Sequence, residues 1–169
     1  MPGRKGIGGH TLANRGASDD WITPRAIIDA LGPFDLDPCA CDPQPWPTAN
    51  AMLTKGGLLV PWTGRVWCNP PYGPETGKWL NRLASHGDGI ALIFARTETE
   101  MFHKYVWGAA TAALFLRGRL NFYTPAGQRS RYNAGGPSVL VAYGELNAGA
   151  IWTAVISGKL KGHVVETKR

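Results

Sequence analysis

The chain has 169 residues, of which 44% are hydrophobic and 18% charged, and this balance is typical of a single globular domain. Eighteen Lys and Arg against 12 Asp and Glu give a net charge of +6, the sign expected of a polyanion binder. No apolar run reaches the roughly 20 residues of a membrane span, and residues 1–16 lack the apolar stretch of a secretory signal. These features argue against a disordered, secreted or membrane protein and favour a cytoplasmic one.

Apolar periodicity and turn residues, taken in chain order, predict the secondary structure. Helices are expected over residues 24–31, 77–85 and 97–107, the first of them capped by Asp20. Strands are expected over residues 34–37, 65–68, 89–94, 112–116, 120–123, 138–143 and 150–156, with weaker candidates at 52–53 and 58–60. The Pro-rich stretch 38–50 and the Gly-rich stretch 124–137 are expected to be loops.

This order of elements predicts an α/β fold. Strands alternate with helices at the start and pair with each other towards the end, so we expect a mostly parallel sheet with an antiparallel hairpin at its C-terminal end. One domain is expected over residues 19–158. A basic N-terminal arm at 1–18 and a basic tail at 159–169 would flank it.

The three cysteines, Cys39, Cys41 and Cys68, bear on disulfide and metal chemistry. An odd number argues against a disulfide framework and fits a reducing compartment. Cys39 and Cys41 are closer in sequence than the pairs of structural zinc sites, and the four histidines form no paired motif. We therefore expect free thiols and no metal.

The sharpest chemical signal is Asn69-Pro70-Pro71-Tyr72, which follows the apolar strand at 65–68. Successive prolines have no N–H and a fixed φ, so their carbonyls are not drawn into a helix and can face a cavity. The Asn69 side chain adds an amide oxygen, and two converging acceptors suit an exocyclic amino group. Tyr72 adds a flat face for stacking a base. A plain turn with a partly buried tyrosine is the structural alternative.

Two further segments suggest how a second ligand is held. Asp37-Pro38 follows the strand at 34–37, and a carboxylate at the carboxyl end of such a strand can bind a ligand ammonium group. Thr23-Pro24 places a hydroxyl and free N–H groups at a helix start, which suits a carboxylate. Together with the pocket for an amino group, these two segments would bind a methionine-like zwitterion next to a base. A turn at Asp37 and a simple helix cap at Thr23 are the structural alternatives.

Five segments share their residues and their order with a known family. They are Trp21-Ile22-Thr23-Pro24, Phe34-Asp35-Leu36-Asp37-Pro38-Cys39-Ala40, Val66-Trp67-Cys68-Asn69-Pro70-Pro71-Tyr72, Ala95-Arg96-Thr97-Glu98-Thr99 with Phe102-His103, and Gly118-Arg119-Leu120-Asn121-Phe122. The chain thereby resembles the bacteriophage DNA N6-adenine methyltransferases (Dam-like) over about residues 20–143. Asn-Pro-Pro-Tyr alone also occurs in glutamine and RNA-base methyltransferases, so the combination carries the resemblance.

The resemblance implies a reduced, Rossmann-like sheet of the S-adenosylmethionine-dependent methyltransferases. It implies methyl transfer to adenine N6 in duplex DNA, on a flipped base, with GATC favoured as the site. If the protein is phage-encoded, it would act in the host cell cytoplasm. The resemblance assigns catalysis to Asn69, Pro70, Pro71 and Tyr72, and cofactor binding to Trp21, Thr23, Pro24, Asp37, Pro38, Cys39 and Asn69.

The chain departs from the larger amino-methyltransferases in two respects. Residues 39–43 contain no glycine, whereas those enzymes continue the cofactor motif with glycines. Only 32 positions separate Asp37 from Asn69, so we expect a helix or a strand pair to be missing between them. The residue that holds the cofactor ribose is therefore not assigned, and Asp42 is only a guess.

Two groups of residues are predicted to contact DNA. Arg96 and Thr97 follow the strand at 89–94 on the sheet edge that carries Asn69, although Thr97 could instead cap a helix. Phe122 could stack on the flipped base or belong to the core.

The loop over residues 117–136 holds the second group, Arg119, Arg129 and Arg131, and contains no acidic residue. Arginine side chains read guanine edges and neutralise phosphates, so this loop suits DNA entry.

Two other functions stay open. The same motif could act on RNA or on a protein glutamine, although the basic loop disfavours the glutamine. The missing glycines could also indicate a catalytically silent DNA-binding module, which the intact Asn69–Tyr72 motif disfavours. The oligomeric state and the biological role are not predicted.

Overall fold

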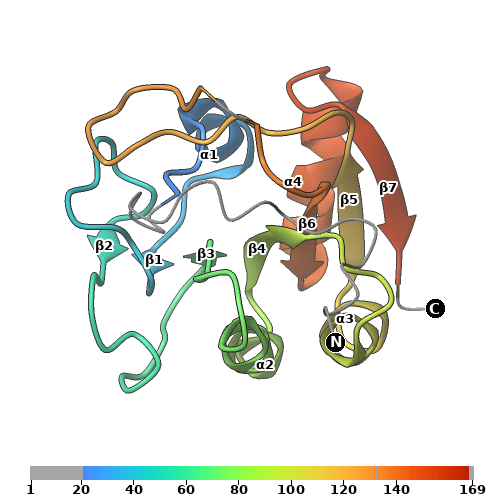
Figure 1. Ribbon diagram of the computed structural model, residues 1–169. Helices are drawn as coiled ribbons and strands as arrows, with labels where there is room; N and C mark the ends of the chain where they lie inside the picture. The colour runs from blue at the N-terminus through green and yellow to red at the C-terminus, as the bar shows by residue number, and fades with distance from the viewer. Residues whose placement is uncertain (1–20, 132, 168–169) are drawn as a thin grey trace, which may run out of the picture.

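The computed structural model describes residues 21–131 and 133–167, which form a mixed sheet with helices on both faces (Figure 1). Among these residues the strand order is β2-β1-β3-β4-β6-β5-β7. The predicted arm at 1–18, the cap at Asp20 and the last two residues of the predicted tail lie outside the described residues.

One half of the sheet is parallel. It consists of β1 (Leu36–Asp37), β2 (Ala51–Met52), β3 (Val66–Cys68) and β4 (Gly89–Phe94). β1 pairs with both β2 and β3, and β3 pairs with β4. Between β1 and β3 every residue is described, and the chain there forms only the two-residue β2 and no helix. This short connection agrees with the 32 positions that separate Asp37 from Asn69.

The other half of the sheet is antiparallel. β6 (Ser138–Tyr143) lies between β4 and β5 (Ala112–Leu116) and runs antiparallel to both, so β4 and β5 share one direction. β7 (Gly162–Glu166) pairs antiparallel with β5 at the edge of the sheet. The predicted antiparallel pair is therefore present as β5 and β6, but the parallel arrangement holds for one half of the sheet only.

The helices cover the sheet in two layers (Figure 1). α1 (Arg25–Leu31) and α4 (Glu145–Ile156) pack on one face, whereas α2 (Thr76–His86), α3 (Glu100–Phe102) and the π-helical turn η1 (His103–Trp107) pack on the other.

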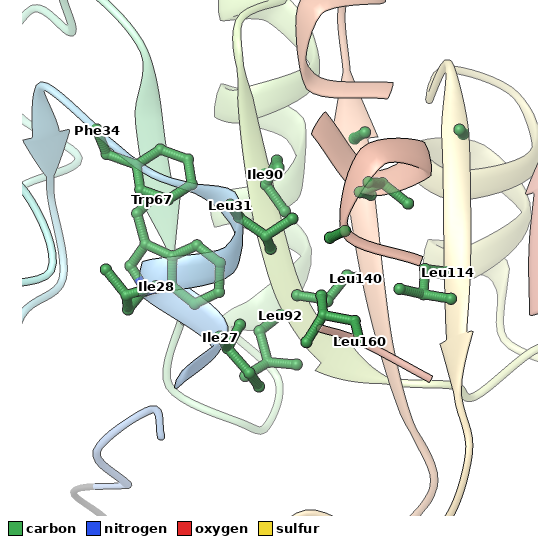
Figure 2. Close-up of a cluster of buried hydrophobic side chains, with 14 of the residues drawn as sticks. Ile27, Ile28, Leu31, Phe34, Trp67, Ile90, Leu92, Leu114, Leu140 and Leu160 are labelled. Atoms are coloured by element: carbon green, nitrogen blue, oxygen red, sulfur yellow. The ribbon is translucent and has the colours of Figure 1, made fainter. Parts of the chain in front are cut away.

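Alternation along the strands divides the core between these layers. Ile90 and Leu92 of β4 face α1 and join Ile27, Leu31 and Trp67 in one cluster, as Figure 2 shows. The intervening β4 residues, Ala91 and Ile93, join the opposite cluster with Leu80 and Leu83 of α2.

Several predicted elements differ from the structure. Residues 150–156, predicted as a strand, belong to α4, because an apolar run without alternation fits a buried helix equally well. Residues 58–60 and 120–123 form no strand. The helix predicted over 97–107 begins only at Glu100. The predicted basic tail includes β7, whose short apolar centre, Val164-Val165, is flanked by polar residues.

The strand order places a switch point between β1 and β3. From β1 the chain moves outward to β2, whereas β3 and β4 extend the sheet in the opposite direction. In open α/β sheets ligands bind beyond the carboxyl ends of the strands at such a point. Among the described residues, no helix is both long and apolar enough to cross a membrane.

Candidate active site

A cavity of about 280 Å³ opens at this switch point. The loop after β1 contributes residues 38–41 to its wall, and the motif after β3 contributes residues 69–72. Residues 54–57, which follow β2, together with Trp21 and Trp79 complete the lining. The two motifs that the sequence places 32 positions apart therefore meet at one cavity.

The Asn69 side chain is fixed in one orientation. Its Nδ2 donates to the Trp21 carbonyl at 2.8 Å, which places the amide oxygen Oδ1 on the other side of the group. No described residue donates a hydrogen bond to Oδ1 or to the neighbouring Pro70 carbonyl. The Pro71 carbonyl, in contrast, accepts from the Thr76 hydroxyl at 2.7 Å. Asn69 Oδ1 and the Pro70 carbonyl are thus the acceptors that the motif leaves available.

Tyr72 is packed among aromatic rings. Its ring stacks on Phe94 with 4.4 Å between centroids and meets Phe122 edge-on at 6.3 Å. Burial raises the pKa of the Tyr72 phenol, so the side chain stays neutral.

A second cavity, of about 190 Å³, adjoins these rings. Trp21, Tyr72, Phe94 and Phe122 line it together with residues 133–135. Trp21 and Tyr72 also line the cavity of about 280 Å³ at the switch point, which is called the larger cavity of this pair from here on. These two residues therefore separate the two spaces. A flat aromatic-walled space of this kind suits a nucleobase.

Asp37 lies behind the cavity wall rather than in it. The side chain is 3% exposed, and its oxygens accept hydrogen bonds from the Cys39 N–H at 3.0 Å and from the Thr48 hydroxyl. Burial raises the pKa of this carboxyl to about 6, against the lowering effect of its two hydrogen bonds. Pro38 and Cys39 follow it directly and do line the cavity, so Asp37 anchors the loop that shapes the wall.

The three cysteines are free thiols, and two of them lie together at the switch point. The Sγ atoms of Cys39 and Cys68 are 3.8 Å apart. Burial, followed by the neighbouring Cys68 thiol, raises the pKa of Cys39, so this thiol is protonated and weakly nucleophilic. Both cysteines therefore act as packing residues between the two motifs.

The segment before α1 is brought to the cavity in part. Trp21 lines it, but Thr23 is 2% exposed and neither Thr23 nor Pro24 is among its lining residues. Pro24 precedes the first residue of α1, and the helix receives no side-chain cap. The Thr23 carbonyl accepts from the Trp46 indole at 3.1 Å, so this residue holds the segment in place.

Arg96 and Thr97 lie on the expected sheet edge, and both are exposed. Arg96 lines a third cavity, of about 520 Å³, beside Tyr72 and Phe94. Thr97 does not cap the following helix. That position belongs to Thr99, whose hydroxyl accepts from the Phe102 N–H at 3.2 Å.

The basic loop over 117–136 folds back on the segment before α1. Tyr123 pairs antiparallel with Ile22 through two backbone hydrogen bonds of 3.0 Å, and it also pairs with Arg129. In Figure 1 this loop, in orange, reaches across the molecule towards β2. The segment that holds the Asn69 amide is therefore itself held by the basic loop.

The arginines of that loop are on its surface. Arg119, Arg129 and Arg131 are all exposed. Arg129 donates to the Asn121 side chain at 3.1 Å, and Arg119 reaches the Ala134 carbonyl at 3.5 Å. Phe122, by contrast, is 2% exposed and lines the smaller cavity with its ring. Phe122 is therefore a core residue that also forms part of the wall of the smaller cavity.

Several residues that line the larger cavity were not predicted as site residues, Lys55 and Trp79 among them. Lys55 is the charged side chain among the described residues that line the larger cavity, and Trp79 of α2 closes one side of it. The Gly56-Gly57 pair that follows Lys55 was the available signal for a close backbone approach. Asp42 is exposed and does not line the cavity, so nothing links it to a ribose.

The donor groups of the site and its similarity to known proteins bear on its identity. Among the described residues, no group of three or more His, Cys, Asp or Glu is placed to hold a metal ion. The family model of DNA N-6-adenine-methyltransferase (Dam) matches residues 10–163, nearly the whole chain, and confirms the resemblance drawn from the five segments. No curated protein and no solved structure matches the chain.

Proposed function

We infer that this chain, which belongs to the DNA N-6-adenine-methyltransferase (Dam) family, delivers a methyl group from S-adenosylmethionine to N6 of an adenine flipped out of duplex DNA. The family itself implies DNA as substrate and adenine N6 as the atom methylated. The observation that carries the finer statement is a pair of acceptors, Asn69 Oδ1 and the Pro70 carbonyl, to which no described residue donates. Both residues line the larger cavity, which shares Trp21 and Tyr72 with the smaller one.

The larger cavity fits S-adenosylmethionine. Its aromatic residues, Trp21, Tyr72 and Trp79, suit both a sulfonium cation and an adenine ring. Its volume of about 280 Å³ lies just below the roughly 300–1,000 Å³ of typical small-molecule sites. The Asp37 carboxyl lies behind this wall, so its proposed part is to anchor the loop that supplies Pro38 and Cys39 to the cavity.

When bound, this cofactor supplies an electrophilic methyl group. The protein's own share is to position the attacking nitrogen. Asn69 Oδ1 and the Pro70 carbonyl would accept hydrogen bonds from the two N6–H groups of adenine, which frees the nitrogen lone pair for attack. As the N6–methyl bond forms, the sulfur–methyl bond breaks, one N6 proton is lost to solvent and S-adenosylhomocysteine is the product. Tyr72, Phe94 and Phe122 hold the flipped base by its faces in the smaller cavity. The Asn69 amide is already oriented by the Trp21 carbonyl, so little reorganisation is needed.

We regard the sheet as a reduced form of the methyltransferase sheet. Its parallel half carries both motifs at the switch point, and its antiparallel strand β6 is inserted between the co-directional β4 and β5. Arg96, Thr97 and the loop arginines would face the duplex from the carboxyl edge. GATC is the recognition sequence that we propose from the family resemblance.

None of the described residues that line the larger cavity is acidic, and this favours one competing function, a silent DNA-binding module. Calorimetric titration with S-adenosylmethionine separates the two. A catalytic protein binds the cofactor, whereas a silent module shows no binding heat.

Methylation of a pool of randomised duplexes tests the proposed function directly. Sequencing that reads N6-methyladenine would show marks concentrated within one short sequence. Parallel incubations with single-stranded RNA and with a glutamine-containing peptide test the other substrate classes. Methyl transfer confined to either of them would contradict the proposal.

A further inference from the structure

The Pro70-Pro71-Tyr72 turn is held by few polar contacts. Prolines donate no backbone hydrogen bond, and the Tyr72 hydroxyl makes only a long contact of 3.4 Å with the Leu92 carbonyl. Gly73, which follows, has a φ of +148°. The turn that presents the available acceptors therefore needs an anchor from outside its own residues.

The first residue of α2 provides this anchor. The Thr76 hydroxyl donates to the Pro71 carbonyl at 2.7 Å and accepts from the Gly73 N–H at 3.0 Å. The Thr76 N–H also donates to the Gly73 carbonyl at 3.2 Å. Thr76 is 5% exposed, so water does not readily replace these contacts. One hydroxyl thus bridges both sides of Tyr72.

We propose that Thr76 is a positioning residue for methyl transfer, which acts by holding the Pro71 carbonyl so that the Pro70 carbonyl and Asn69 Oδ1 stay aimed at the target amine. This inference rests on the proposed function. Thr76 lines neither the cavity proposed for the cofactor nor the smaller, aromatic-walled one; it lines the third cavity, beside Tyr72 and Phe94. Its hydroxyl governs the orientation of the turn.

The expected consequence is a loss of turnover without a loss of cofactor affinity. Displacement of a reacting group by about 1 Å can cost about 100-fold in rate. Thr76→Val keeps the shape of the side chain and removes both hydroxyl contacts. We expect kcat to fall by about 10- to 100-fold, while the Kd for S-adenosylmethionine changes by less than about threefold.

Two companion variants separate positioning from general stability. Thr76→Ser keeps the hydroxyl and should retain kcat within about threefold of the parent. Thr111→Val removes another buried threonine hydroxyl, which accepts a hydrogen bond from the Gly144 N–H at 3.0 Å. Thr111 directly precedes β5, at the sheet edge opposite the active site. It should lower the melting temperature and leave kcat within about threefold. If Thr76→Val does not fold, Thr76→Cys, with a weaker donor in similar space, takes its place.

The experiment measures kcat, KM for a duplex and cofactor Kd for the full chain and all variants. A selective loss of kcat in Thr76→Val, rescued in Thr76→Ser, supports the proposal. Parent-like kcat in Thr76→Val, an equal loss in Thr76→Ser, or an equal loss in Thr111→Val would overturn it. A parent protein that methylates no DNA would instead contradict the proposed function, so the two failures are distinguishable.

Discussion

The proposed methyl transfer depends above all on Asn69, because its amide is oriented by one hydrogen bond and no described residue donates to its oxygen. Asn69→Ala removes one of two amine acceptors. We expect methyl transfer to fall by at least about 100-fold, in line with about 3 kcal/mol for a preorganised polar group. Single-turnover methylation measures the loss, and unchanged cofactor Kd controls for folding. Near-parent turnover in a folded variant would contradict the assigned role.

Asp37 makes stability depend on pH. Its pKa is about 6 in the folded chain against 3.8 for an ordinary aspartate, so between these values the folded state retains a proton that the unfolded chain has released. The contribution of Asp37 to the free energy of unfolding therefore falls as pH rises from about 4 to about 6. At 1.36 kcal/mol per pKa unit the total is on the order of 3 kcal/mol.

Urea denaturation of the parent and of Asp37→Asn across pH 4–7.5 tests this dependence. Stability of the parent relative to Asp37→Asn should decrease with rising pH in that window and level off above it. Profiles that run parallel throughout would show that Asp37 titrates normally.

The motif residues could be predicted one by one, but the hydrogen bonds that bury or occupy some of their polar groups could not. Asn69, Pro70 and Tyr72 were assigned from the donors and acceptors that their side chains and backbone carry. The burial of Asp37 depends on Thr48 and Cys39, which the folded loop brings to its carboxyl group. The engagement of the Pro71 carbonyl depends on Thr76, a residue with no signal of its own in the sequence.

At the scale of the elements, the loop after β2 contacts the loop after β1 through Gly57. A Cβ at this position would lie 1.8 Å from the Pro38 carbonyl oxygen. Gly57→Ala should therefore separate the two walls of the larger cavity. We expect a loss of about 1–3 kcal/mol in stability, as for other overpacked sites, and a cofactor affinity reduced more than about tenfold.

Gly149→Ala is the matched control for this prediction. Gly149 lies within α4, and nothing stands within 4 Å of the Cβ it would gain. Alanine should stabilise the helix by up to about 1 kcal/mol and leave cofactor binding unchanged. Calorimetry and thermal unfolding measure both variants. Equal cofactor affinity in Gly57→Ala and the parent would remove this loop contact from the site.

The basic loop belongs to the DNA interface in our account. If Arg129 and Arg131 contact phosphates, their double change to Ala should reduce the slope of log K against log salt by about two units. If one of them reads a base edge, sequence preference should relax at one position by about 1–3 kcal/mol. The double change of Lys159 and Lys161, which are exposed before β7 at the far edge of the sheet, controls for net charge. Identical slopes and preferences in the loop variant and the parent would exclude this loop.

For the whole molecule, the elements near the motifs were more predictable than those far from them. α1 is bounded by Pro24 and Gly32, and β4 is a continuous apolar run, so both were predicted closely. α4 was mistaken for a strand because it is apolar on nearly all sides: Ile151 and Ala154 pack on the sheet, but Leu146 and Ile156 are exposed. β7 pairs at an edge beside β5, a long-range contact that local pattern does not specify.

The central claim is that Asn69 and Pro70 present an adenine amino group to a methyl donor. The most direct measurement is mass analysis of nucleosides from duplex DNA incubated with the protein and isotope-labelled S-adenosylmethionine. We predict labelled N6-methyl-2′-deoxyadenosine with the parent, and an amount of this nucleoside at least about 100-fold lower with Asn69→Ala. Absence of labelled adenine with a folded, cofactor-binding parent, or equal labelling by Asn69→Ala, would contradict it.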